Sequence, residues 1–180
     1  MILKLLCLLP LLMMLVYPSQ GYSKQPIRTL KGTVTKVYDG DSIKINSQGI
    51  KLKIRLYGID APETEKRKKK TGRVSKPGQP YGEEARKALE DSIYLTKIKV
   101  DVMDIDRHKR LVSVVWLNNR NINKEMIAQG WAWAFRKYLD EPYASEFICL
   151  EEQARQKRLG LWQQYNPQPP WKFKKMLKLK

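Results

Sequence analysis

Apolar and polar side chains alternate along several short stretches of this chain, as is typical of β-strands with one face in a core. The alternation is clearest between residues 52 and 57, where Leu52, Ile54 and Leu56 share the core face and Arg55 and Tyr57 point the other way. Arg55 is therefore expected to be a cation held on a rigid strand. The same pattern predicts strands at 30–38, 42–46, 98–103 and 111–117.

Three stretches have the apolar spacing and the end signals of helices. The first, 81–94, has small and apolar side chains on one face and acidic residues in its first turn. A short second helix is capped by Asn121 or Asn123 and ends at Gly130, and a longer third one covers 140–158. Five strands of antiparallel type, one inserted helix and two later ones predict an α+β fold, a five-stranded OB-fold β-barrel with three helices.

Three segments depart from this pattern. Residues 1–21 have a lysine near their start, Lys4, followed by a short apolar run and then small residues, which predicts a secretory signal peptide. An uncleaved membrane anchor is the alternative, although spanning a bilayer takes about 20 apolar residues. Residues 65–80 predict a long mobile basic loop, either merely solvated or gripping substrate phosphates. The basic, Pro-rich tail 164–180 is expected to be disordered by itself, which leaves 30–163 as one domain.

Charge and cysteine content narrow the classes of partner and mechanism. The 180 residues carry a formal net charge of +17, which predicts an anionic partner, either nucleic acid or a membrane surface. Without the leader, Cys149 is the remaining cysteine, so no internal disulfide is expected, and its apolar helical surroundings predict a buried structural thiol. The chain also lacks the motifs of zinc clusters, serine-nucleophile elbows and Walker loops.

Two aspartates fit a site for a hard cation. Asp39-Gly40 is a two-residue hairpin signal that places Asp41 at the start of the second strand. Asp60 follows the strand that carries Arg55. If the second and third strands are neighbours in the barrel, Asp41 and Asp60 converge and offer carboxylate oxygens to a cation such as calcium.

The remaining charged groups nearby fit phosphodiester hydrolysis. This reaction needs a base that activates water and cations that stabilise charge on the phosphate oxygens. Glu63 is the candidate base, and Arg55 and Arg110 are the candidate clamp. For an isolated arginine with two acids, however, an ordinary surface salt bridge is the commoner interpretation.

Three motifs in order carry a resemblance to a known family. They are Val-Tyr-Asp-Gly-Asp-Ser at 37–42, Arg-Leu-Tyr-Gly-Ile-Asp-Ala-Pro-Glu at 55–63 and Asp-Arg-His-Lys-Arg at 106–110. With a basic loop and a helix between the second and third motifs, the chain resembles the staphylococcal nuclease, or thermonuclease, family over approximately 30–162.

The resemblance implies a calcium-dependent endonuclease that acts on DNA and RNA and cuts the bond to the 5′ oxygen. Asp41, Asp60 and the backbone carbonyl of Ala61 would hold calcium, and the catalytic residues would be Arg55, Glu63 and Arg110. Residues expected to contact nucleic acid are Lys68, Lys69, Lys70, Arg107 and His108.

The third motif departs from the family's pattern. His108 and Lys109 stand where the family usually has an aromatic residue and a glycine, and loss of that glycine would change the turn that aims Arg110. His108 either stacks on a base or binds phosphate, or it is a solvent-exposed turn residue. Asp39 and Asp106 are expected to form turns or to support ligands rather than to be ligands.

Three functions therefore compete. The first is a secreted or periplasmic monomeric nuclease without a stable protein partner. The second is a catalytically inactive nucleic-acid-binding OB-fold module, which has no reason to keep the full set of acids and arginines. The third is a basic protein that associates with anionic membrane lipids through its tail.

Overall fold

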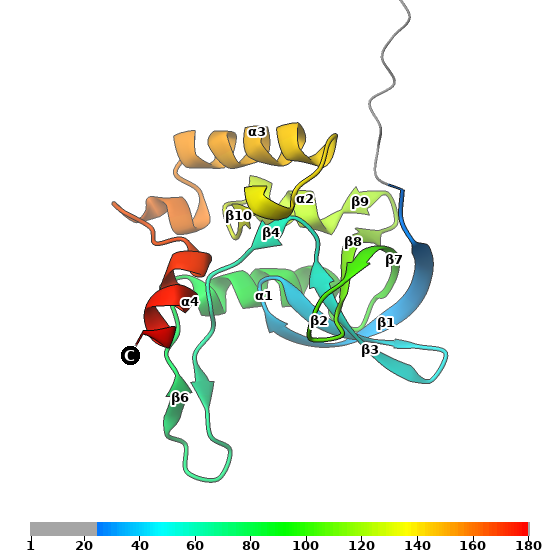
Figure 1. The fold of residues 1–180 in the computed structure, drawn as a ribbon, viewed down its shortest axis with the longest axis horizontal. Helices are drawn as coiled ribbons and strands as arrows, with labels where there is room; N and C mark the ends of the chain where they lie inside the picture. Colours follow the sequence, from blue (N-terminus) through cyan, green and yellow to red (C-terminus); the bar gives the residue numbers. More distant parts are fainter. Residues whose placement is uncertain (1–24, 180) are drawn as a thin grey trace, which may run out of the picture.

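Five strands close into a barrel in the computed structural model, which describes residues 25–179 (Figure 1). The order around the barrel is β3-β2-β1-β7-β8, and β8 closes it by pairing in parallel with β3, whereas the other pairs are antiparallel. The predicted α+β barrel is therefore confirmed. Its strands are β1 (Arg28–Asp39), β2 (Ser42–Ser47), β3 (Ile50–Leu56), β7 (Lys97–Ile105) and β8 (Leu111–Leu117).

The barrel core consists of the inward-facing aliphatic side chains of these strands. Ile43, Ile54 and Val100 are fully buried, as the alternation predicts. Tyr57 does point away from Ile54, but it is buried too, because it packs edge-on against Tyr143 of the third helix at 5.6 Å between ring centroids. Both faces of the β3 end are thus covered, which makes this strand a rigid support for Arg55.

Within the described residues, four helices pack beside the barrel, where three were predicted. They are α1 (Gly82–Ile93), α2 (Ile122–Ala128), α3 (Tyr143–Gln156) and α4 (Pro170–Lys178). The additional one is α4, in the tail that was expected to be disordered. It lies beside the base of the protruding hairpin of residues 66–76 and near the start of α1 (Figure 1). Within residues 25–179, no helix has the length and apolar character needed to cross a bilayer.

Short elements complete the fold. The single turns η1 (Arg136–Tyr138) and η2 (Gly160–Gln163) flank α3, and β9 (Arg120–Asn121) precedes α2. The side chain of Asn121 accepts a hydrogen bond from the backbone N–H of Lys124 and so caps α2. The basic segment 65–80 contains a small antiparallel hairpin, formed by β5 (Lys66–Arg67) and β6 (Val74–Lys76). The small strands β4 (Ile59–Asp60) and β10 (Trp133–Ala134) pair beside the barrel.

Two local predictions are wrong. The β1–β2 turn consists of Gly40 and Asp41 rather than Asp39 and Gly40, because β1 continues through Asp39. Cys149 is exposed rather than buried, since α3 turns Phe147 toward the core and Cys149 toward solvent. The predicted signal peptide, 1–21, lies outside the described residues.

Gly40 positions the first motif against the second. A Cβ atom on Gly40 would lie 2.7 Å from the Cβ of Ala61 and 2.9 Å from that of Ala85, distances that real Cβ atoms do not adopt. A bare backbone at this position therefore allows the turn to approach both the Asp60-Ala61 segment and α1. The consequence is that Asp41, the next residue, lies beside Asp60.

Candidate active site

Arg55 joins the two aspartates at the end of β3. One terminal nitrogen of its guanidinium lies 2.6 Å from Oδ1 of Asp60, and the other forms an ion pair with Oδ1 of Asp41. The first nitrogen also donates to the carbonyl of Ile59 at 3.2 Å. Because both carboxylates accept from a single guanidinium, they lie side by side, as the sequence predicts.

Asp41 is buried and fully hydrogen-bonded. Its Oδ2 accepts from the backbone N–H of Ala61 at 2.8 Å, and its Oδ1 accepts from the hydroxyl of Ser42 at 2.8 Å. Burial alone would raise the pKa of Asp41, but the Arg55 guanidinium, the nearby hydrogen bonds and the charge of a nearby lysine together outweigh burial and lower this pKa to about 2. Burial and the neighbouring charge of Asp41 raise the pKa of Asp39 to about 8. Asp39 itself accepts from the backbone N–H of Asp41 at 3.2 Å, which is the turn-forming contact expected of it.

Asp60 is held in place through its backbone. It pairs with Trp133 in the β4–β10 ladder, and the N–H of the next β10 residue, Ala134, donates to Oε2 of Glu151 at 2.6 Å. Glu151 is a buried acid on α3 that also accepts from Arg155 at 2.8 Å. Sequence reasoning missed this support, because a glutamate in an amphipathic helix gives no sign that it is buried against a distant strand.

Glu63 lies between two lysines at the edge of the site. Its Oε2 accepts from Lys76, and its Oε1 lies 3.3 Å from Nζ of Lys174. Burial raises the pKa of Glu63, but the hydrogen bond from Lys76 and the charge of Lys174 more than offset it and hold the pKa below its usual 4.5. Glu63 is therefore an ionised carboxylate at neutral pH, the form required of a base.

Lys174 reaches the site from α4 and was not predicted. Its Nζ lies 2.9 Å from Oδ1 and 3.1 Å from Oδ2 of Asp60. The aromatic and apolar residues spaced between lysines in this tail were the signal that could have revealed an amphipathic helix.

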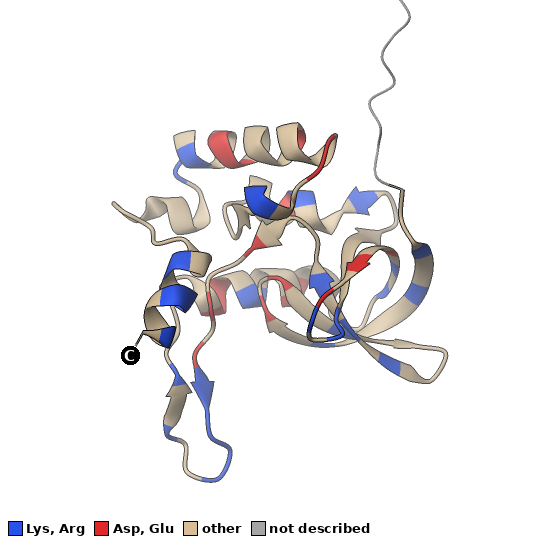
Figure 2. Ribbon diagram, in the orientation of Figure 1, with Lys and Arg blue, Asp and Glu red and all other residues tan. Residues whose placement is uncertain are grey.

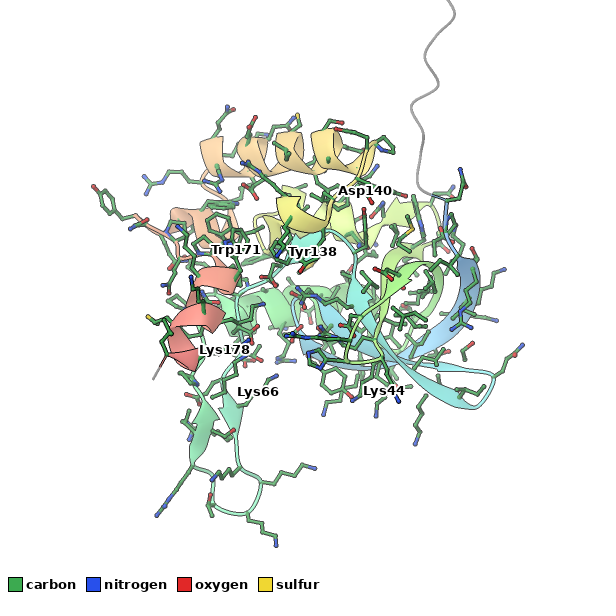
Figure 3. The ribbon with its side chains drawn as sticks, viewed as in Figure 1. Lys44, Lys66, Tyr138, Asp140, Trp171 and Lys178 are labelled. Carbon is green, nitrogen blue, oxygen red and sulfur yellow. The ribbon has the colours of Figure 1, made fainter. Side chains whose placement is uncertain are left out.

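Aromatic contacts dock α4 against the rest of the protein. Trp171 stacks on Phe135 with ring centroids 5.3 Å apart and meets Trp133 edge-on at 5.5 Å, and Phe173 is buried. Phe135 in turn meets Tyr138 edge-on at 4.9 Å. Trp171 and Tyr138, labelled in Figure 3, both contact the ring of Phe135.

The third motif keeps its turn despite the missing glycine. Lys109 adopts a φ of 58°, the left-handed conformation that glycine usually supplies. Oδ1 of Asp106 accepts from the backbone N–H groups of His108 at 2.8 Å and Arg110 at 3.0 Å. Its Oδ2 accepts from Nε of Arg110 at 2.7 Å, so Asp106 both forms the turn and orients the arginine.

The three motifs meet at one cleft of about 910 Å³. Its lining includes Arg55 and Glu63 of the second motif and Arg107, His108 and Arg110 of the third. Figure 2 shows lysines and arginines along the β5–β6 hairpin and α4, next to the acids of the site. Lys66, labelled in Figure 3, lies at the base of this hairpin and lines the cleft together with Lys76. Three predicted nucleic-acid contacts, Lys68, Lys69 and Lys70, are exposed at the hairpin tip and are not part of the lining.

The donor set at Asp41 and Asp60 fits a hard divalent cation. Within residues 25–179, no three His, Cys, Asp or Glu side chains form a metal-binding cluster. Two carboxylates nevertheless lie side by side with two cationic groups, Arg55 and Lys174, on their oxygens. The carbonyl of Ala61 follows directly in the chain. Calcium prefers oxygen ligands, and here two carboxylates and a carbonyl would supply some of them and water the rest.

Comparison with known proteins agrees with these motifs. The model of a family described as "Staphylococcal nuclease homologue" matches residues 53–164. The chain is 34% identical to Protein ParB of Escherichia coli, over 81% of this chain and 80% of that protein. It is 32% identical to a micrococcal nuclease of Shigella flexneri, over 82% of each chain. It is 33% identical to an uncharacterized endonuclease of Haemophilus influenzae, over 81% of this chain and 74% of that one.

Proposed function

Since the chain belongs to the staphylococcal nuclease family and is an endonuclease of that type, we propose that it hydrolyses both DNA and RNA in a calcium-dependent reaction after export from the cytoplasm. The observation that carries the proposal is the meeting of Arg55, Glu63 and Arg110 in a single basic cleft above two paired aspartates. The predicted leader, 1–21, supports export.

Glu63 acts as the base in this proposal. Its carboxylate is ionised at neutral pH because neighbouring lysines hold its pKa low, so it can take a proton from an attacking water. Glu63 lines the cleft, and its backbone is held by Gln79, whose Oε1 accepts from the backbone N–H of Glu63 at 3.2 Å. A low pKa also means that Glu63 is a mild base, so positioning of the water contributes much of the effect.

Arg55 and Arg110 stabilise the charge that develops on phosphate. Both guanidinium groups line the cleft that a phosphodiester would enter. A planar guanidinium donates to two phosphate oxygens at once, which favours arginine over lysine for this role. Asp106 keeps Arg110 oriented before substrate arrives, which lowers the reorganisation needed in the transition state.

Asp41, Asp60 and the carbonyl of Ala61 would hold calcium. The ion, when bound, supplies positive charge close to the scissile phosphate. The cleft lining is consistent with action on both nucleic acids, because cationic side chains contact phosphates and do not distinguish the sugar or the base.

Two observations favour the enzyme over the other functions. An inactive binding module has no use for Glu63 at the edge of paired aspartates, since a carboxylate does not bind phosphate. Lipid association through the tail requires the apolar side chains of that tail, whereas Phe173 is buried and Trp171 stacks on Phe135. Two of the largest apolar side chains of the tail are thus already used within the protein, and the exposed apolar residues that remain on α4 and at its end are Met176 and Leu179.

Cleavage assays on circular single-stranded DNA and on an RNA of defined sequence test the proposal. Incubated with calcium, the purified protein should convert the circles into linear fragments and cut the RNA, and a chelator should stop both reactions. Cleavage that persists in chelator would contradict calcium dependence, and binding without any cleavage would favour the inactive module.

Glu63→Gln tests the base and is compared with Glu65→Gln, which removes an exposed acid two residues away. Glu63→Gln should lower turnover by about a hundredfold or more, because it keeps the shape of the side chain but removes the base. Binding of DNA and the circular dichroism spectrum should stay unchanged. Equal turnover of the two variants would exclude Glu63 as the base.

A further inference from the structure

Lys174 makes contacts that resemble those of a bound cation. Its three N–H groups have three carboxylate oxygens within reach, two from Asp60 at 2.9 and 3.1 Å and one from Glu63 at 3.3 Å. An ammonium group has three donors and no acceptor, so these oxygens saturate it. By contrast, Lys76 pairs with the other oxygen of Glu63. The ammonium of Lys174 is thus the group that bridges Asp60 and Glu63, both of which belong to the second motif.

The buried charge of Asp60 explains why a second cation is needed there. The Asp60 side chain has 0% exposure, and Arg55 divides its two terminal nitrogens between Asp60 and Asp41. An ionised carboxylate without full compensation is costly in a buried site. Lys174 supplies the missing positive charge when no divalent cation is present.

Lys174 and calcium compete for the same carboxylate oxygens. Calcium held by Asp41 and Asp60 needs the carboxylate oxygens that Lys174 and Arg55 occupy, and two positive charges a few ångströms apart repel each other. Of the two side chains, Lys174 is the one that can leave, because it is a flexible lysine with 33% of its side chain exposed, whereas 15% of the Arg55 side chain is exposed.

The docking of α4 allows the lysine to move without loss of the helix. Trp171 and Phe173 hold α4 through ring contacts, and Gln79 donates to the carbonyl of Gln168 at 2.9 Å. None of these contacts involves the Lys174 side chain. The helix therefore serves as a fixed base from which a single lysine reaches the site.

We propose that Lys174 is an internal substitute for the divalent cation: its ammonium neutralises Asp60 and Glu63 in the metal-free protein and has to leave when calcium binds. This inference rests on the calcium site of the proposed function. It makes Lys174 an internal competitor that lowers the apparent calcium affinity and releases Glu63 from one ion pair when the metal arrives. Because such coupling is reciprocal, calcium must weaken the contacts of Lys174 as much as Lys174 weakens those of calcium.

Calorimetric titration with calcium, in the absence of nucleic acid, measures the competition. Lys174→Gln should bind calcium about tenfold more tightly than the wild type, the size expected for a coupling of one to two kcal/mol. Lys175→Gln is the matched control, because it removes the same charge from an exposed neighbour on the same helix. It should bind calcium as the wild type does. Equal or weaker binding by Lys174→Gln would overturn the proposal.

Labelling of amines in the wild-type protein provides a measurement that needs no variant. An amine-reactive reagent followed by peptide mass spectrometry should modify Lys174 faster as calcium is added, in parallel with the calorimetric binding curve, while labelling of Lys175 stays constant. Labelling of Lys174 that does not change with saturating calcium also overturns the proposal. A wild-type protein that binds no calcium at all would instead remove the calcium site itself, and this inference with it.

Discussion

Lys109 occupies a left-handed backbone conformation, with φ of 58°, in the turn between Asp106 and Arg110. For a residue with a Cβ atom this conformation costs about 1–2 kcal/mol. The turn persists because Asp106 accepts hydrogen bonds from two backbone N–H groups and from the Arg110 guanidinium. These bonds outweigh the cost of the left-handed conformation. A departure from the family's motif therefore changes the energy of this turn more than its shape.

Lys109→Gly should stabilise the protein. Glycine adopts positive φ without steric cost but is more flexible when unfolded, so we expect a net gain of about 0.5–1 kcal/mol. In a chain of this size that gain corresponds to a rise of about 1–4 °C in Tm, measurable by scanning calorimetry. Lys109→Ala removes the same charge but keeps the Cβ atom and should give no such rise. An equal rise for both variants would attribute the effect to charge rather than to backbone conformation.

Asp106 should make stability depend on pH in the acid range. Partial burial alone would raise its pKa, but the backbone N–H and guanidinium of Arg110 lower the pKa of Asp106 below its usual 3.8. A carboxylate whose pKa is lower in the folded state than in the unfolded state stabilises the fold at pH values above its unfolded-state pKa. This stabilisation is lost as the pH falls through its folded-state pKa. Asp106→Asn should therefore unfold more easily than the wild type at pH 6, and the difference should shrink below about pH 4. Urea unfolding at both pH values measures this, and a difference that grows with acidity would contradict it.

The proximity of residues that stand in the motifs could be predicted, whereas a contact made from a distant part of the chain could not. Asp41, Asp60, Glu63 and Arg110 stand in short patterns, and the structure brings them to one site. Lys174 reaches Asp60 across 114 residues of sequence. No local pattern reports a contact of that separation, so only the fold reveals it.

Among the elements, the barrel strands are predictable because alternation over five to seven residues determines which face is buried. The observed β8, Leu111–Leu117, has the predicted bounds. In contrast, α4 has nine residues, and isolated helices of that length are marginal in water. It is stable here because Trp171 and Phe173 pack against other elements, which the sequence alone does not reveal.

Asn123 connects the elements where the barrel closes. Its amide donates to the carbonyls of Tyr57 at 2.9 Å and Ser113 at 3.1 Å, and its Oδ1 accepts from the N–H of Val115 at 2.9 Å. The sequence offered it as an alternative helix cap, but Asn121 has that role. Asn123 instead joins the end of β3, which carries Arg55, to β8.

Asn123→Ala should cost about 3 kcal/mol of stability, because it leaves up to three buried backbone groups without a partner. Asn121→Ala, which removes a helix cap, should cost about 1 kcal/mol. Urea unfolding of both variants gives the comparison. A loss for Asn123→Ala no larger than that for Asn121→Ala would show that water or a backbone shift replaces the bonds at the barrel closure.

At the scale of the whole molecule, net charge and its distribution have separate effects. The charge of +17 attracts any polyanion, whereas the lysines and arginines of the β5–β6 hairpin and of α4 are concentrated in neighbouring elements (Figure 2). Lys68, Lys69 and Lys70 lie outside the cleft lining, so their contact with nucleic acid requires a strand that extends beyond the cleft. Whether the hairpin binds substrate or is only solvated, the two possibilities left open by the sequence, thus depends on substrate length.

Replacing Lys68, Lys69 and Lys70 together by alanine distinguishes these possibilities. If the hairpin binds phosphates, KM for a long strand should rise and its logarithmic dependence on salt should flatten by up to about 0.7 per lost contact on single-stranded substrate. KM for a short oligonucleotide that fits within the cleft should hardly change. The control replaces three exposed lysines elsewhere on the barrel, Lys31, Lys51 and Lys53, and so removes the same charge. An electrostatic field acts through net charge, whereas a contact depends on position. Equal salt slopes for the two triple variants would therefore mean that the overall field attracts substrate and that the hairpin makes no phosphate contact of its own.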